Sequence, residues 1–167
     1  GLNAPFGSSM GRLFDAAAFL TGAASRNSFD GQAGMALEAL AEAGGETAPL
    51  PFAWHPGSPL QLDAVEALLA LVERQRAGES AASLARAFHA GLAAAVQKGC
   101  EQVRQTTGLD RVVLSGGVFQ NRLLAELVYT FLTDRGFAVH SHRLVPPNDG
   151  GIALGQAAIA AYTRQRG

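Results

Sequence analysis

Several marks of common protein classes are absent from this sequence. Cys100 is the only cysteine among 167 residues, so no disulfide can form within the chain and no group of thiolates can hold a metal ion. Lysine and arginine number 13 against 14 aspartate and glutamate residues, so no strong field attracts nucleic acid or an anionic membrane. No basic stripe with interleaved aromatic residues occurs, which argues against nucleic-acid binding.

Long apolar runs are missing as well, although hydrophobic residues make up 48% of the chain. The longest runs are too short and too often interrupted to cross a bilayer. The first residues lack the basic-then-apolar pattern of a secretory signal. The composition therefore predicts a cytoplasmic protein with neither a membrane nor a nucleic acid as partner. A chain of this length fits one domain and can bury roughly 68–70% of its unfolded surface.

Residues 1–107 are predicted to be mostly helical, after an extended lead-in over residues 1–7. Apolar residues recur at helical spacing, and serine or glycine stands at the expected boundaries. Residues 46–59 contain four prolines and are expected to be mostly irregular. Helices are expected over residues 8–20, 31–43, 60–77 and 80–106.

Residues 108–167 change to alternating strands and helices. The expected elements are strands at 111–114 and 137–140, a helix at 122–135, a third extended segment at 144–145, and a small-residue helix suited to tight packing at 150–162. A strand, a helix and a second strand in this order imply a parallel pair with a right-handed crossover.

The predicted fold class is therefore a helix-rich α/β protein with a small parallel sheet. Parallel sheets are normally wider than two or three strands and are covered on both faces. We therefore expect the chain to be part of a larger domain whose other strands lie upstream. An incomplete sheet leaves an unpaired edge, which can drive formation of a homodimer.

The most informative stretch is Val112–Asn121. Val112-Val113-Leu114 reads as a buried strand, the Ser115-Gly116-Gly117 turn ends it, and Asn121 opens the next helix. Backbone N–H groups at a glycine turn and at a helix start can face an anion. Two adjacent glycines also let a flat or charged ligand approach the main chain. The stretch predicts a nucleotide or phosphorylated ligand, with an ordinary glycine turn as the alternative.

A second glycine-containing loop, Pro146–Gly151, joins the strand region to the last helix. Asn148 or Asp149 is suited to cap that helix, and Asp149 is alternatively a carboxylate ligand for a metal ion. Both glycine loops follow the carboxyl ends of neighbouring parallel strands, which is where open α/β sheets bind ligands. We therefore expect the two loops to converge at one rim of the sheet.

Asp15 lies within the first expected helix, off its apolar face. It is either a solvated carboxylate paired with Arg12 or an acceptor for ribose hydroxyls, as acidic residues are in other nucleotide sites. The remaining candidates favour structural roles. His140 and His142 share a strand face and are expected to be solvent-facing rather than a metal pair. His89 is expected to be a packed helix histidine, His55 a loop contact, and Cys100 an inert thiol.

Three segments of the sequence closely resemble the C-terminal part of the HypF family, the carbamoyltransferases that mature [NiFe] hydrogenases. They are Ser8–Asp15, Val113–Asn121 and Val145–Gln156, and the Phe-Asp-Gly-Gln-Ala stretch at 29–33 is also similar to that family. The likeness runs from about Asn3 to Ala160. The family is related to the threonylcarbamoyl transferases of tRNA modification.

The resemblance implies an actin/Hsp70-like ATPase fold and a defined chemistry. HypF-like proteins use carbamoyl phosphate and ATP, with Mg, to form a carbamoyl-adenylate. They then pass the carbamoyl group to the C-terminal cysteine of a HypE-type partner. By this resemblance the whole chain is the C-terminal portion of the adenylate-forming domain, with a helical part at 1–107 and a nucleotide-binding part at 108–167.

Carried over residue by residue, the resemblance assigns six positions. Gly116, Gly117 and Asn121 would line the nucleotide site, Asp15 would hold the ribose, Gly31 would lie against the nucleoside, and Asp149 would bind a divalent metal, zinc or iron, in the full-length protein.

The sequence departs from the family pattern in lacking a His-x-x-x-His metal pair, zinc-finger cysteines and an acylphosphatase-like domain. We therefore expect the chain alone to be inactive as a carbamoyltransferase. The alternatives are a non-catalytic nucleotide-binding module and a module that docks a partner protein.

Overall fold

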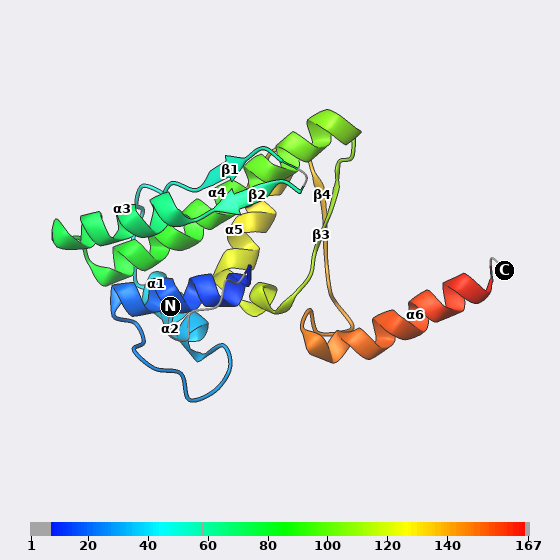
Figure 1. Ribbon diagram of the computed structural model, residues 1–167, viewed down its shortest axis with the longest axis horizontal. Coiled ribbons are helices and arrows are strands. Elements are labelled where there is room, and N and C mark those ends of the chain that lie inside the picture. The colour runs from blue at the N-terminus through cyan, green and yellow to red at the C-terminus, as the bar shows by residue number, and fades with distance from the viewer. Residues whose placement is uncertain (1–7, 58, 166–167) are drawn as a thin grey trace.

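The computed structural model describes residues 8–57 and 59–165 (Figure 1). The lead-in predicted for residues 1–7 lies outside this part. The elements, in chain order, are α1 Met10–Thr21, α2 Gln32–Glu42, β1 Ala53–His55, β2 Gln61–Asp63, α3 Val65–Arg76, α4 Ala81–Thr107, β3 Arg111–Leu114, the 3-10 turn η1 Gly117–Gln120, α5 Arg122–Thr133, β4 Ala138–Ser141, the 3-10 turn η2 Asp149–Gly151, and α6 Ile152–Arg164.

The long helix α4 forms the centre of the body and contacts α1, α2, α3 and α5. Its start is fixed as the sequence predicts, because the Ser80 side chain accepts a hydrogen bond from the Ser83 backbone N–H. Phe88 and Leu92 on α4 are fully buried. A side chain at Gly91 would overlap the carbonyl group of Leu50, so the segment before β1 lies directly on the helix.

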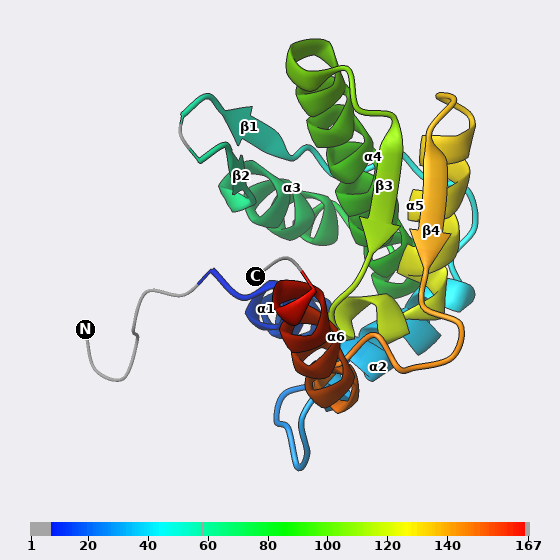
Figure 2. The same ribbon diagram turned by 90° about the vertical axis from the view of Figure 1, so that its right-hand side faces the viewer.

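Strands β3 and β4 form the predicted parallel pair, in register from Arg111 opposite Ala138 to Leu114 opposite Ser141. Helix α5 lies against one face of this pair (Figure 2). Leu114 is buried, whereas Val113, on the opposite face, is 68% exposed. The pair is thus covered on one face only within the described residues, which agrees with the predicted small parallel sheet.

Residues 46–52 are irregular as predicted, but the prediction missed a short antiparallel hairpin within residues 53–63. Strand β1 pairs with β2, with Trp54 opposite Leu62, and α3 begins only at Val65. The cause is a tertiary contact: the Trp54 ring packs against Gly99 of α4, and Trp54 Nε1 donates a hydrogen bond 2.8 Å long to the Ala95 carbonyl oxygen. Prolines disfavour helix here, but this contact selects a strand.

Two expectations near the C-terminal end also need correction. Residues 144–145 form no strand in the described chain. Helix α6 is exposed along its length in the described chain, instead of being tightly packed as predicted, and it extends away from the body as an arm (Figure 1). No helix of the described chain combines the length and apolar character that crossing a membrane requires.

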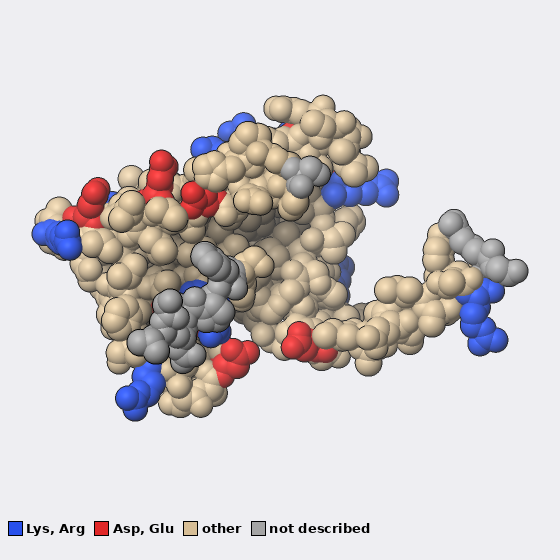
Figure 3. Space-filling model, in the orientation of Figure 1, with Lys and Arg blue, Asp and Glu red and all other residues tan. Residues whose placement is uncertain are grey.

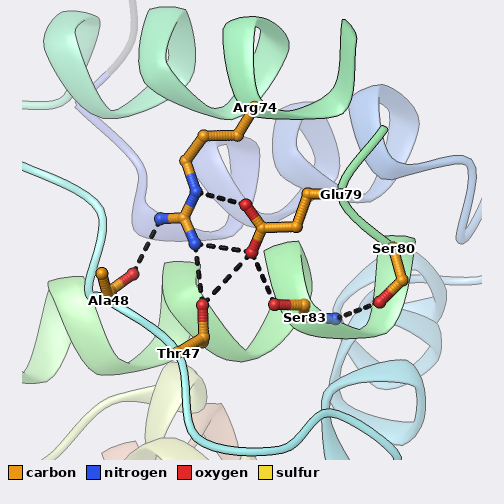
Figure 4. Close-up of polar contacts among 6 residues, drawn as sticks. All are labelled: Thr47, Ala48, Arg74, Glu79, Ser80 and Ser83. Atoms are coloured by element: carbon orange, nitrogen blue, oxygen red, sulfur yellow. Dashed lines mark hydrogen bonds and ion pairs between the residues drawn. The ribbon is translucent and has the colours of Figure 1, made fainter. Parts of the chain in front are cut away.

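A polar network ties the turn between α3 and α4 to the segment before β1 (Figure 4). Arg74 binds both oxygens of Glu79 at 2.6 Å. The same guanidinium group donates to the Ala48 carbonyl and to the Thr47 hydroxyl, each at 2.7 Å. The Ser83 hydroxyl donates to Glu79 as well. The hydrogen bond from Arg74 is the largest cause, and the hydrogen bond from Ser83 the next, of a pKa of Glu79 lowered to about 2.

This network makes part of the stability depend on pH. A carboxyl group with a lowered pKa stabilises the fold above its unfolded pKa of 4.5 and loses that contribution as the pH falls toward about 2. We expect Glu79→Gln to lower the free energy of unfolding at pH 7 by about 1–2 kcal/mol, and to lower it less at pH 3. Urea denaturation at both pH values measures this. Exposed Glu73→Gln is the control, and an equal loss at both pH values would contradict the assignment.

Candidate functional site

The two glycine-containing loops meet, as the sequence predicts. The Gly116 N–H donates a hydrogen bond 2.8 Å long to the Pro147 carbonyl oxygen. Gly116 adopts a φ of 102°, a left-handed conformation that favours glycine. A Cβ at Gly117 would lie 3.9 Å from the Asn148 side chain. The loop after β3 and the loop after β4 therefore form one continuous rim.

This rim forms one wall of a cavity of about 820 Å³, within the size range of small-molecule sites. The other walls come from the start of α1, from the residues before α2, and from α2 itself. Segments more than 100 residues apart in the sequence thus share one hollow. All six residues that the sequence singled out line it: Asp15, Gly31, Gly116, Gly117, Asn121 and Asp149.

Asp15 is held by two neighbours in this cavity. Its Oδ2 atom lies 2.9 Å from Arg12 Nη1, and its Oδ1 atom accepts a hydrogen bond 3.2 Å long from Asn27 Nδ2. The sequence offered two roles for Asp15, and its pairing with Arg12 is the structural one. The carboxylate remains partly accessible, with 23% of its side chain exposed, so the ribose contact stays a prediction.

The charge of the cavity wall is predominantly negative. The wall contains four carboxylate side chains and one cationic side chain, Arg12. Arg12 is already shared between Asp15 and Asp30, at 2.9 and 3.7 Å. Acidic atoms lie beside the α1–α2 loop and at the base of α6 (Figure 3). Such a wall favours hydroxyl donors and cations, and phosphate groups bind beside it only with a cation between them.

An apolar part of the same wall faces these charges. Met10, Phe14, Met35 and Val118 line the cavity. Phe14 is fixed from behind by Phe88, whose ring lies 5.1 Å away in an edge-to-face arrangement. A flat heterocycle fits such a surface, and the carboxylates are placed to accept hydrogen bonds from its polar substituents.

Two of the first N–H groups of α5 are engaged by side chains of this chain and do not face an anion, while an anion along the rest of this stretch stays a prediction. Asn121 Oδ1 accepts a hydrogen bond from the Leu124 N–H at 2.8 Å, and Glu38 Oε1 accepts one from the Leu123 N–H at 3.1 Å. A carboxylate at a helix N-terminus already satisfies the charge preference of that position. The first N–H groups of η1, at Gly117 and Val118, have no partner within their own turn and remain the candidates for an anion.

The described residues do not supply a complete metal site. No group of three or more histidine, cysteine, aspartate or glutamate side chains that could hold a metal ion occurs in this part of the chain. Asp149 is exposed at the start of η2, and the helix turn there is capped by Asn148, whose Oδ1 accepts from the Gly150 N–H. His142 contacts the Ser115 hydroxyl at 2.9 Å. The metal role of Asp149 stays a prediction that needs ligands from elsewhere.

The structural interpretations of His89 and Cys100 are confirmed, whereas His55 lies in strand β1 and not in the expected loop. His55 Nε2 contacts Asp63 Oδ2 at 2.9 Å across the β1–β2 hairpin. His89 is fully buried in α4. Cys100 is half-buried, and burial together with Glu101 raises the pKa of its thiol, which disfavours the reactive thiolate.

Sequence reasoning missed Met35 and Glu38 as cavity residues. A signal for them was present, because Gly31, Met35 and Glu38 follow one another at helical spacing and therefore share a face of α2. The contact between His89 and Asn121, 3.0 Å between Nε2 and Nδ2, had no signal, since the two residues lie 32 positions apart.

Comparison with known proteins places this geometry in a family. A family model described as "Carbamoyltransferase, Kae1-like Domain, second subdomain" matches residues 1–156. Carbamoyltransferase HypF2 of Cupriavidus necator is 40% identical, over 95% of this chain and 22% of the relative. Carbamoyltransferase HypF of Rhodobacter capsulatus is also 40% identical, over 96% of this chain and 20% of the relative.

Solved structures show the same fold. A crystal structure of full-length HypF in the phosphate- and nucleotide-bound form superimposes with a TM-score of 0.86 at 38% identity, covering 92% of this chain and 20% of that one. The structure of T. kodakarensis HypF gives a TM-score of 0.86 at 27% identity, covering 99% and 21%. The chain spans about a fifth of the length of the curated relatives it matches. It belongs to the HypF carbamoyltransferase family and corresponds to the C-terminal part of those proteins.

Proposed function

We propose that this chain supplies the nucleoside-binding wall of a carbamoyltransferase site in which carbamoyl phosphate and ATP, with Mg, form a carbamoyl-adenylate. The observation that carries the proposal is the meeting of the Gly116 and Asp149 loops with Asp15 and Gly31 around one cavity. The carbamoyl group then passes to the C-terminal cysteine of a HypE-type acceptor in hydrogenase maturation. The full reaction belongs to a longer protein of which this chain is one part.

The nucleoside is assigned to the cavity by the chemistry of its walls. Asp15 accepts hydrogen bonds from the ribose hydroxyls, as acidic residues do in other nucleotide sites. Gly31 and the apolar part of the wall lie against the nucleoside base. Gly116 and Gly117 carry no side chains, so the nucleotide can approach the main chain there. Asn121, at the start of α5, lines the same cavity.

The phosphates require positive charge that this cavity does not provide. With Arg12 engaged by two carboxylates, neutralisation falls to Mg or to residues of the remaining protein. The divalent zinc or iron ion expected beside Asp149 does not fit the described residues alone, and this chain contributes one carboxylate toward it. The role of this chain's own residues is therefore to bind and orient the nucleoside.

Two features of the relatives support this proposal. One matching crystal structure is of HypF in a phosphate- and nucleotide-bound form, and the matching family model is described as Kae1-like. An actin/Hsp70-like ATPase fold and a cytoplasmic location accord with the proposal and remain parts of it.

A partner-docking role is the second candidate, and α6 is the observation that favours it. Ile152, Leu154, Ile159 and Tyr162 on this helix are each more than half exposed, and most of the arm is uncharged (Figure 3). Upstream parts of the same protein, a HypE-type acceptor and a second copy of the chain are the proposed partners. A nucleotide-binding module without catalysis is the remaining alternative.

The nucleotide assignment predicts an effect of Gly117→Val. A Cβ at this position meets only the Asn148 Cβ, at an ordinary distance of 3.9 Å, so we expect the fold to tolerate the side chain, which occupies space that a nucleotide would use. We expect the dissociation constant for Mg-ATP, measured by isothermal titration calorimetry, to rise at least tenfold with the melting temperature unchanged. Gly45→Val, also in open space, is the matched control. Equal affinity of the two variants would contradict the nucleotide assignment.

The incomplete metal site predicts that the 167-residue chain alone does not catalyse formation of the carbamoyl-adenylate. We expect no carbamoyl-phosphate-dependent exchange of pyrophosphate into ATP, because phosphate neutralisation and the rest of the metal site lie outside the described residues. Radiolabelled pyrophosphate exchange measures this. Clear turnover by the chain alone would show that it carries a complete catalytic site.

A further inference from the structure

The buried histidine of α4 touches a residue of the cavity wall, and every hydrogen-bonding role in that contact is fixed by its surroundings. His89 is 0% exposed. Its Nδ1 atom lies 2.8 Å from the Ala85 carbonyl oxygen, and its Nε2 atom lies 3.0 Å from Asn121 Nδ2. Asn121 in turn lines the cavity and caps α5.

The donor and acceptor at each atom follow from the two outer partners. A carbonyl oxygen only accepts, so His89 Nδ1 carries a hydrogen. The Leu124 backbone N–H only donates, so the Asn121 atom 2.8 Å from it is the amide oxygen, and the atom facing His89 is the amide nitrogen. The neutral ring then offers a lone pair at Nε2, and Asn121 Nδ2 donates to it.

A protonated ring is incompatible with this arrangement. It would carry hydrogens on both nitrogens and would set two donors, Nε2–H and Nδ2–H, against each other at 3.0 Å. Burial lowers the pKa of His89, which agrees with a neutral ring. The charged groups around it largely oppose one another, since Glu38 of α2 raises this pKa and Arg86 of α4 lowers it.

The same logic defines what Asn121 offers to a ligand. Its amide oxygen is engaged by Leu124 and one amide hydrogen by His89. No other described residue accepts from this amide, and Asn121 lines the cavity, so its second hydrogen is left for a ligand. Without His89 the amide could rotate and present its oxygen instead, at the cost of the α5 cap.

We propose that His89 is a positioning residue which locks the orientation of the Asn121 amide so that its nitrogen presents a hydrogen-bond donor to the cavity. The inference deepens the proposed function and rests on it for the identity of the ligand. The group bound at this point is then a hydrogen-bond acceptor, such as an oxygen or a ring nitrogen of the nucleotide. A ligand with only donors at this position is rejected, because two donors would face each other.

The tautomer of His89 tests the inference without any ligand. We expect long-range ¹H–¹⁵N correlation spectra of the 167-residue chain to show Nδ1 protonated and Nε2 unprotonated from pH 5.5 to pH 8. Asn121→Asp places a carboxylate oxygen opposite Nε2, so we expect that variant to take up a second ring proton and to titrate at higher pH. A ring protonated at Nε2 in the wild-type chain at neutral pH would overturn the proposal.

The affinity for Mg-ATP provides a second test of the role of His89. His89→Leu fills the buried position with an apolar side chain but removes the Nε2 acceptor. We expect about a tenfold rise in the dissociation constant. His89→Gln can place its amide oxygen where Nε2 lies, and we expect it to recover most of the loss. A role in packing alone would give both variants the same affinity, which would overturn the proposal. If the wild-type chain binds neither Mg-ATP nor adenosine, the proposed function fails, while the tautomer measurement still decides the role of His89.

Discussion

The buried face of α4 is the constraint on which the cavity depends. Phe88 and His89, side by side on this helix, both contact Phe14 of α1, with ring centroids at 5.1 and 5.4 Å. His89 also holds Asn121 at the start of α5. Two walls of the cavity lie more than 100 residues apart in the sequence. Both are therefore held in place by contacts with two adjacent residues of α4. Because interiors are closely packed, a displacement of α4 moves both walls together.

Local sequence signals were sufficient to predict the helices and strands whose ends are set by their own residues. Ser80 begins α4 and Asn121 begins α5 through side-chain caps, and the parallel pairing of β3 with β4 follows from a strand–helix–strand order. The β1–β2 hairpin carries no such signal, because Trp54 becomes a strand residue only through contact with Gly99 and Ala95 of α4. Tertiary contacts of this kind override local preference.

The residues of the cavity show the same difference between features that local sequence predicts and features that tertiary contacts determine. The glycine loops and Asp15 were recognisable from sequence because their residue types have few alternative uses and because the ends of parallel strands share a rim. The engagement of Glu38 with the start of α5 was not, since it joins residues 85 positions apart. That contact changes the chemistry expected of the site: a helix start that would otherwise attract phosphate is already neutralised by a carboxylate of α2.

Under the proposed function, this wall binds the nucleoside but leaves the phosphate charge unneutralised, which has a consequence for how such a protein is assembled. If this wall carried its own cations, it could hold ATP tightly without the rest of the protein. With Arg12 engaged by Asp15 and Asp30 and the start of α5 occupied by Glu38, the proposed binding of the phosphates would depend on groups contributed from outside these walls. Electrostatic stabilisation is worth most in a closed, water-excluded site. Dividing nucleoside recognition from phosphate neutralisation therefore makes charge stabilisation available only when both parts are together.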